Sequence, residues 1–146
     1  MTITRIDNSK QLDKHIGTDS FIDFLHTHLD QFGDPKPAIM NCIDFAFKKN
    51  GGLGGFLLSA EIEGELVGAL IMNRTGMKGY IPENILVYVA VDASRRGQGL
   101  GRSIVERALE EADGDVKLHV EYENPAKKLY ERIGFTTKYA EMRWKR

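Results

Sequence analysis

Apolar residues recur along the chain with two different spacings, and these spacings divide it into strands and helices. Alternating or continuous apolar positions predict strands at 2–6, 56–62, 66–73, 85–91, 116–120 and 136–144. Apolar positions three and four residues apart predict amphipathic helices at 21–32, 39–47, 100–112 and 126–133. The pattern therefore predicts a chain in which helices and strands are mixed along the sequence.

Glycine and proline separate these elements without dividing the chain into parts. Gly33, Pro35 and Pro37 break the chain between the first two helices, and the glycines of 51–55 form a flexible connection. The segment 63–65 joins two of the strands, which we expect to pair as a hairpin. With no repeat or low-complexity tract in 146 residues, we expect one domain spanning 1–146.

The turn that follows the strand at 85–91 has a composition suited to phosphate binding. It reads Arg95-Arg96-Gly97-Gln98-Gly99-Leu100-Gly101-Arg102 and leads into the helix at 100–112. The first amides of a helix lack partners, the helix dipole is positive there, and glycine lets an anion approach the backbone. The turn fails the dinucleotide motif G-x-G-x-x-G, because Arg102 stands at its last glycine, and it lacks the Walker A lysine before Ser103. It therefore predicts a phosphate or pyrophosphate site of another kind.

Two motifs in this half of the chain resemble those of the GCN5-related N-acetyltransferase (GNAT) family. The first is Arg96-x-x-Gly99-x-Gly101, which resembles the acetyl-CoA signature of that family. The second is Asn124-Pro125-Ala126-Lys127-Lys128-Leu129-Tyr130-Glu131-Arg132-Ile133-Gly134-Phe135, in which alanine, tyrosine and glycine stand four residues apart. One departure is that the asparagine stands two residues before the alanine, where three is commoner in the family.

This resemblance implies a fold and a co-substrate. The fold is an α/β (α+β) domain with a mixed, mostly antiparallel central sheet flanked by helices, and its cofactor cleft lies between splayed central strands. The co-substrate is acetyl-CoA, with its pyrophosphate on the amides of the glycine-rich turn and its pantetheine arm along the preceding strand. The residues implied in cofactor binding are Val89, Val91, Arg96, Gly97, Gln98, Gly99, Leu100, Gly101, Arg102, Asn124, Lys127 and Tyr130.

The same resemblance implies roles in amine acetylation. Tyr130 is the candidate general acid for the CoA thiolate, because a phenol with a pKa near 10 stays protonated at neutral pH. Glu83 is the candidate base, acting through water, and we expect it to face the same side of the strand as Val87, Val89 and Val91. Tyr122 and Glu123 are further candidates, because Ile85 occupies the position from which some family members supply a glutamate.

Composition and charge narrow the range of partners. A net charge of −1 predicts neither a nucleic-acid surface nor an anionic-membrane surface. No apolar run reaches the roughly 20 residues of a membrane span, and no secretory signal begins the sequence, so we expect a cytoplasmic protein. Cys42 lies on an apolar helical stripe and is expected in the core, and no His or Cys pair has metal-ligand spacing.

The sequence leaves the acceptor and the class of function open. The expected acceptor is a small-molecule or peptide amine. Acidic residues of the first helices either attract a cationic amine or form the solvated face of a helix, namely Asp19, Asp23, Asp30 and Asp34. One alternative is a non-catalytic acyl-CoA-binding sensor of the same fold, and another is an unrelated nucleotide-binding domain. A homodimer through the segment 139–144 is also possible, with Trp144 either as an exposed anchor or in the core.

Overall fold

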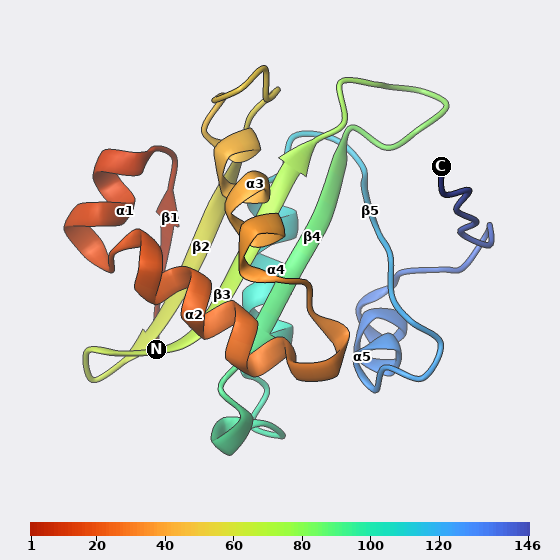
Figure 1. Cartoon of the computed structure of the whole chain (residues 1–146). Helices are drawn as coiled ribbons and strands as arrows, with labels where there is room; N and C mark the ends of the chain where they lie inside the picture. Colours follow the sequence, from red (N-terminus) through yellow and green to blue (C-terminus); the bar gives the residue numbers. More distant parts are fainter.

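Five strands lie in chain order in a single sheet (Figure 1). The strands are β1 (Thr2–Ile6), β2 (Gly55–Ile62), β3 (Glu65–Arg74), β4 (Asn84–Val91) and β5 (Val116–Leu118). Neighbours from β1 to β4 are antiparallel, and β5 runs parallel to β4. The computed structural model describes all residues 1–146 and confirms the mixed, mostly antiparallel sheet and the hairpin of β2 and β3.

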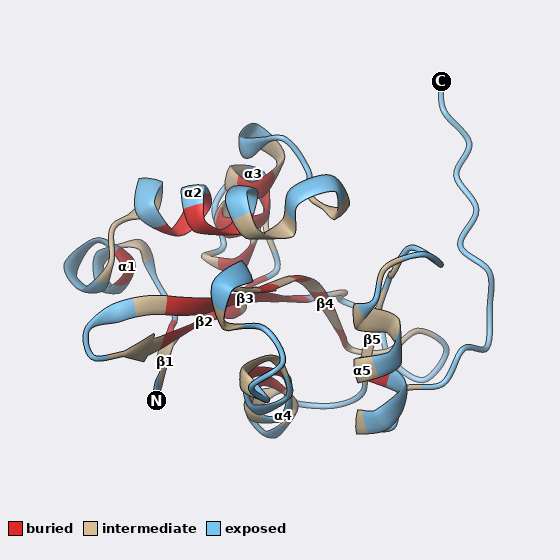
Figure 2. Cartoon of the chain, turned by 90° about the horizontal axis from the view of Figure 1, so that it is seen from below, coloured by how far each residue is buried: buried red, intermediate tan, exposed pale blue.

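Helices cover both faces of this sheet (Figure 2). One face carries α1 (Ser9–His15), α2 (Thr18–Leu29) and α3 (Lys36–Ala46), and the other carries α4 (Leu100–Glu111) and α5 (Ala126–Ile133). Short 3-10 turns follow α2 at Asp30–Phe32 and β4 at Ala93–Arg95. None of these helices combines the length and apolar content that crossing a bilayer requires.

The core consists of two apolar layers, one on each face of the sheet. Because successive side chains of a strand point to opposite faces, Leu57 joins the layer under α2 and α3, whereas Leu58 joins the layer under α4. Cys42 lies in the first layer, as its helical stripe predicts, and burial raises the pKa of its thiol to about 12. The thiol is therefore protonated and unreactive at neutral pH.

Helix α1 is an element that the apolar spacing does not predict. It has seven residues and buries only Leu12, so it offers no repeat of apolar positions to detect. Its start is fixed instead by Asn8, whose side-chain oxygen accepts a hydrogen bond from the Gln11 amide at 2.9 Å. Such an N-cap contributes about 1 kcal/mol to helix stability.

A bulge in β4 coincides with the place where β5 leaves it. Tyr88 pairs with Ile71 and Leu86 pairs with Met72, so Val87 is an extra residue on β4. The last pair between β4 and β5 is Leu86 with Leu118. A bulge bends a strand and increases its twist, and here it carries the C-terminal half of β4 away from β5. The two strands therefore splay apart, as the family resemblance implies.

The predicted last strand is absent. Residues 136–144 form neither strand nor helix, and the C-terminal segment, defined here as 136–146, leaves the body of the protein fully exposed (Figure 2). Its alternating apolar pattern is typical of a strand, but a strand forms only beside a partner backbone. No backbone hydrogen bond joins this segment to a neighbour, and β5 likewise ends at Leu118, two residues earlier than predicted.

Candidate functional site

The glycine-rich turn links the end of β4 to the start of α4. Asp92 directly follows β4 and caps the 3-10 turn by accepting a hydrogen bond from the Ser94 amide at 2.8 Å. Gly97 and Gly99 follow with φ of +79° and +80°, a backbone region that other residues rarely adopt, and Gly99 is the N-cap of α4. A side chain at either glycine would meet no protein atom within 4 Å, so the space above the turn is open.

The amides of this turn have no partner within the chain. None of the backbone N–H groups from Gly97 to Arg102 donates a hydrogen bond to backbone or side chain, and the first bond of α4 is from Ser103 to Gly99. Six consecutive free donors at the positive end of a helix form a cradle for an anion with several oxygens, such as a pyrophosphate. These residues fit the phosphates of a CoA molecule.

The arginines of the turn are bound to other groups rather than held over the cradle. Arg95 pairs with Glu65 at 3.1 Å, and Arg102 pairs with Glu106 at 2.7 Å on the same helix. Arg96 donates to the carbonyl oxygen of His28 at 2.5 Å, at the end of α2. Because that carbonyl is neutral, the charge of Arg96 remains uncompensated beside the turn, while its contact ties the turn to α2.

Beyond Leu86, one edge of β4 has no strand beside it. Val89 pairs with Leu70 and Val91 pairs with Gly68 on the β3 side, whereas β5 no longer accompanies β4 there. The open edge leads from the bulge to the glycine-rich turn, so an extended ligand bound at the turn can continue along the backbone of β4.

The second motif lies next to this turn. A Cβ on Gly101 would lie 3.3 Å from Leu129 and 3.6 Å from Val91, so the first turn of α4 is closely packed against α5 and β4. Tyr130 follows Leu129 on α5, is 8% exposed and packs edge-on against Phe135 at 5.8 Å between ring centroids. The two motifs are therefore in contact in the fold.

Burial sets the protonation state of Tyr130. Desolvation alone raises the pKa of its phenol to about 12, since no hydrogen bond stabilises the phenolate. No protein group forms a hydrogen bond with its hydroxyl, and the hydroxyl oxygen is not fully buried. A phenol in this state is protonated and available to donate to a ligand.

Asn124 and Lys127 have structural partners at the start of α5. The Asn124 side chain accepts a hydrogen bond from the amide of Ala126, the first residue of α5, at 2.9 Å. Lys127 pairs with Glu131 at 3.3 Å one turn later. Both line an open cavity of about 400 Å³ beside Tyr122 and Glu123, and Tyr122 is 79% exposed.

The expected placement of Glu83 needs correction. Val87 and Tyr88 both contact the layer under α2 and α3, while Val89 and Val91 contact the layer under α4. The bulge therefore reverses the alternation, so Val87 and the residues at even spacing before it, Glu83 included, are on the opposite face from Val89. Glu83 lies before β4, where its carboxylate accepts a hydrogen bond from the Asp115 amide at 3.0 Å.

A polar pair that sequence reasoning missed lies at the bulge. The Tyr88 hydroxyl donates to the Asp34 carboxylate at 2.5 Å, and Tyr88 is 8% exposed whereas Asp34 is exposed. Burial, together with this carboxylate, raises the pKa of Tyr88 well above its usual range. The two residues are 54 positions apart, and no local spacing relates them. The pair places a fixed carboxylate on the α2–α3 face of the sheet, at the point where the strands separate.

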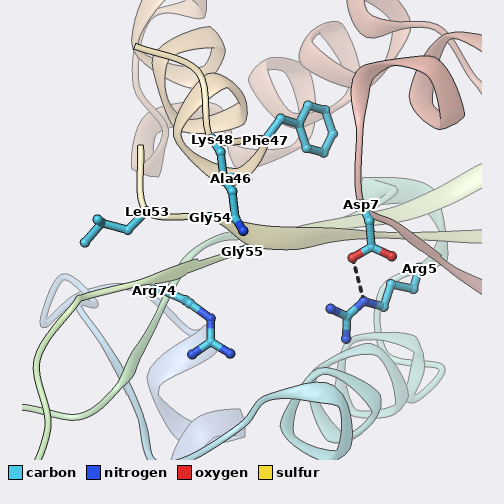
Figure 3. Close-up of a pocket in the computed structure, with 9 residues that line it drawn as sticks. All are labelled: Arg5, Asp7, Ala46, Phe47, Lys48, Leu53, Gly54, Gly55 and Arg74. Atoms are coloured by element: carbon cyan, nitrogen blue, oxygen red, sulfur yellow. Dashed lines mark hydrogen bonds and ion pairs between the residues drawn. The ribbon is translucent and has the colours of Figure 1, made fainter. Parts of the chain in front are cut away.

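A second cavity lies at the other end of the sheet (Figure 3). It has a volume of about 500 Å³ between the end of β1, the start of β2 and the end of α3, and it is lined by Arg5, Asp7, Lys48 and Arg74 among others. Arg5 is ion-paired with Asp7 at 2.9 Å. None of the residues implied in cofactor binding or catalysis lines this cavity, so it is separate from the glycine-rich turn.

Comparison with known families identifies the fold. Residues 54–137, more than half of the chain, match the acetyltransferase (GNAT) domain family. The chain belongs to the GNAT family. The match contains both the glycine-rich turn and Tyr130, and it confirms the resemblance seen in the motifs. Among curated proteins, no sequence matches this chain.

Solved GNAT acetyltransferases share the whole architecture. The aminoglycoside N-acetyltransferase AAC(6')-Iy, in complex with CoA, is 12% identical, with a TM-score of 0.70 over 99% of this chain and 95% of that one. The aminoglycoside 6'-N-acetyltransferase AAC(6')-IG from Acinetobacter haemolyticus is 11% identical, with a TM-score of 0.68 over 100% and 98%. The ribosomal-protein-alanine N-acetyltransferase from Brucella melitensis biovar Abortus 2308 is 17% identical, with a TM-score of 0.62 over 99% and 98%. At sequence identities this low, the similarity to these structures establishes a shared fold and nothing more.

Proposed function

We propose that this protein is an N-acetyltransferase that transfers the acetyl group of acetyl-CoA to a primary amine. The observation that carries the proposal is the row of six free amides from Gly97 to Arg102, joined to an open strand edge and packed against the helix of Tyr130. A GNAT acetyltransferase needs a pyrophosphate cradle, a path for the pantetheine arm and a proton donor near the sulfur. The three features supply these in one connected surface.

The binding mode follows from the free backbone groups. The pyrophosphate accepts hydrogen bonds from the amides of the turn, where the α4 dipole adds to the attraction. The pantetheine arm extends along the open edge of β4 and bonds the backbone of Val89 and Val91 as an added strand. An N–H near Val89 then polarises the thioester carbonyl, because oxyanion stabilisation requires a fixed donor at that oxygen.

The reaction is a direct attack on the thioester. The neutral amine nitrogen attacks the carbonyl carbon, so the nitrogen–carbon bond forms, the carbon–sulfur bond breaks and the amine loses one proton. The sulfur leaves as a thiolate, to which the Tyr130 hydroxyl donates. We assign Glu83 as the carboxylate that takes up the amine proton. The proton passes through water, because the hydrogen bond from the Asp115 amide holds the Glu83 carboxylate away from the amine.

The acceptor amine enters from the α2–α3 face. Tyr130 belongs to the layer under α4, so it protonates the sulfur from one side of the sheet and leaves the other side free for the amine. On that side the Asp34 carboxylate, held by Tyr88 at the bulge, attracts a cationic group. This supports a small-molecule or peptide acceptor that carries a second positive charge besides the reacting amine.

The decisive experiment measures both products. The pure protein is mixed with acetyl-CoA and a panel of diamines, aminoglycosides and peptides, and released thiol and acetylated amine are followed by colorimetry and mass spectrometry. We expect equal amounts of both with at least one amine, and strong reduction in Tyr130→Phe. Acetyl-CoA binding by calorimetry without turnover on any amine would instead support the sensor function. A thermal shift with ATP or NAD but none with acetyl-CoA would contradict both.

A further inference from the structure

One residue at the end of helix α2, His28, is joined to the chain between β4 and the glycine-rich turn. The Ala93 amide donates a hydrogen bond to Nδ1 of the His28 ring at 3.1 Å, and the Arg96 guanidinium donates to the His28 carbonyl oxygen at 2.5 Å. The ring lies tilted against that of Phe24, one turn earlier in α2, with 4.4 Å between ring centroids. His28 therefore holds two positions that lie just before the six free amides.

These contacts reach a part of the chain that has few bonds of its own. Asp92 fixes the 3-10 turn through Ser94, but beyond it Gly97 and Gly99 have positive φ, and the amides from Gly97 to Arg102 have no partner within the chain. A glycine-rich segment with few hydrogen bonds samples several backbone conformations. Contacts that fix its start reduce this number, and so reduce the entropy that is lost when a ligand orders the amides.

The hydrogen bond from Ala93 requires one protonation state of His28. A backbone N–H only donates, so Nδ1 must offer a lone pair, and the proton of the neutral ring lies on Nε2. The imidazolium carries a proton on both nitrogens and would set two donors against each other. Protonation of the ring therefore breaks this contact. The charged groups around it are Asp92 and Arg95 beside Ala93, Glu65 paired with Arg95, Arg96 in the glycine-rich turn and Asp30 after α2.

We propose that His28 is a positioning residue for acetyl-CoA binding: its neutral ring holds the start of the glycine-rich turn, and its protonation weakens the binding of acetyl-CoA. This inference rests on the proposed function, in which the pyrophosphate binds the amides of the turn. His28 acts through Ala93 and Arg96 and not on the reacting atoms. Imidazole side chains generally titrate between about pH 5 and about pH 8. The affinity for acetyl-CoA is therefore highest above this range and falls as the pH is lowered through it.

The first test compares two amide side chains that place their oxygen differently. The oxygen of asparagine is bonded to Cγ, as Nδ1 is, so His28→Asn keeps an acceptor for the Ala93 amide that does not titrate. The oxygen of glutamine lies one bond further, near the place of Nε2, so His28→Gln does not supply this acceptor. By calorimetry, the dissociation constant for acetyl-CoA at about pH 7.5 should rise about fivefold in His28→Gln, as expected for one lost hydrogen bond, and stay near the wild-type value in His28→Asn. Both variants lose the ring contact with Phe24, so an equal loss of affinity in both would overturn the proposal, as would no loss in His28→Gln.

The second test follows the same affinities as the pH is lowered from about pH 7.5 to about pH 5. The phosphate monoester of CoA also gains a proton in this range, so the measured quantity is the difference between variants. The dissociation constant of the wild type should rise about fivefold more than that of His28→Asn. The matched control is His26→Asn, at an exposed histidine of the same helix, which should behave as the wild type does. An equal pH dependence in His28→Asn and the wild type would overturn the proposal.

A third measurement separates this inference from the proposed function. In the protein without acetyl-CoA, NMR follows the ring nitrogens of His28 and the Ala93 amide during an acid titration. We expect the Ala93 amide and those from Gly97 to Arg102 to shift with the same midpoint as the ring. If they do so while no acetyl-CoA binds at any pH, the proposed function fails and His28 still holds the turn. An Ala93 amide that does not follow the ring would overturn the inference even where acetyl-CoA binds.

Discussion

The glycine-rich turn and the Asp34–Tyr88 pair lie on different sides of the same strand and are built by different means. The turn offers backbone amides, and its function depends on two glycines at positive φ and on the start of α4. The pair offers side chains, and it depends on a loop after α2 reaching over a bulge in β4. A backbone site has to suit every acetyl-CoA enzyme of this fold, whereas a side-chain site can vary with the acceptor.

The strongest test of this contrast is Gly99→Val. Valine is strained at a φ of +80° and its side chain would project into the open space above the free amides. We expect the dissociation constant for acetyl-CoA, measured by calorimetry, to rise at least about 100-fold, or about 2.7 kcal/mol. Gly79→Val is the control, since Gly79 has a φ of +83° and equal space but lies far along the chain from the turn. Equal loss of affinity in both variants would contradict a specific role for the turn.

The next largest effect is expected at Tyr130, the residue that we propose as the acid for the leaving group. Tyr130→Phe keeps the packing against Phe135 and removes only the hydroxyl. We expect kcat to fall about 100-fold, within the usual range for general acids, with little change in acetyl-CoA affinity. Tyr139→Phe, at an exposed tyrosine after α5, should retain full kcat. Full turnover in Tyr130→Phe would remove the tyrosine from the mechanism.

A smaller effect is expected on the acceptor side. Asp34→Asn removes the charge and retains the shape, so KM for a dicationic amine should rise about tenfold, or about 1.4 kcal/mol. The affinity for acetyl-CoA should stay unchanged, and this would distinguish an acceptor site at Asp34 from the acetyl-CoA site at the turn. Asp19→Asn, an exposed aspartate in the first turn of α2, serves as the control. An unchanged KM for every amine tested would show that Asp34 does not contact the acceptor.

The pH profile should show the least change. Burial raises the pKa of Tyr130 to about 12, so the protonated, donating form persists where an ordinary phenol with a pKa of about 10 would already ionise. Because a raised pKa favours the acid, kcat should not decline between about pH 8 and about pH 10 on account of this group. A descending limb in that range that disappears in Tyr130→Phe would show a lower pKa in the complex.

Local features of the sequence were sufficient to predict most elements of the fold. The apolar runs of β2, β3 and β4 and the amphipathic pattern of α4 gave elements within a few residues of the observed bounds. Helix α1 escaped prediction because a helix that buries only Leu12 has no periodicity. The strand predicted at 136–144 was wrong for the single chain because its apolar alternation is a local property, whereas pairing needs a second backbone.

The candidate site divides in the same way. The glycine-rich turn and the helix that carries Tyr130 were predicted as elements, because the residues that specify each of them lie within a short stretch of chain. Three features were not predicted, because each depends on how distant segments pack. They are the contact between the two motifs, the bulge at Val87 and the hydrogen bond from Tyr88 to Asp34. The partners of Arg95, Arg96 and Arg102 belong to this second group.

The sequence by itself determined the order of most elements, the glycine-rich turn between strand and helix, and the residues that resemble an acetyltransferase. These depend on backbone preferences and on apolar periodicity, which act between residues close in the chain. Only the tertiary structure decided which side of β4 each residue faces, which carboxylate is held at the bulge and which strand edges stay open. These depend on the register of paired strands and on packing, where one extra residue in β4 reverses the direction of the side chains that follow.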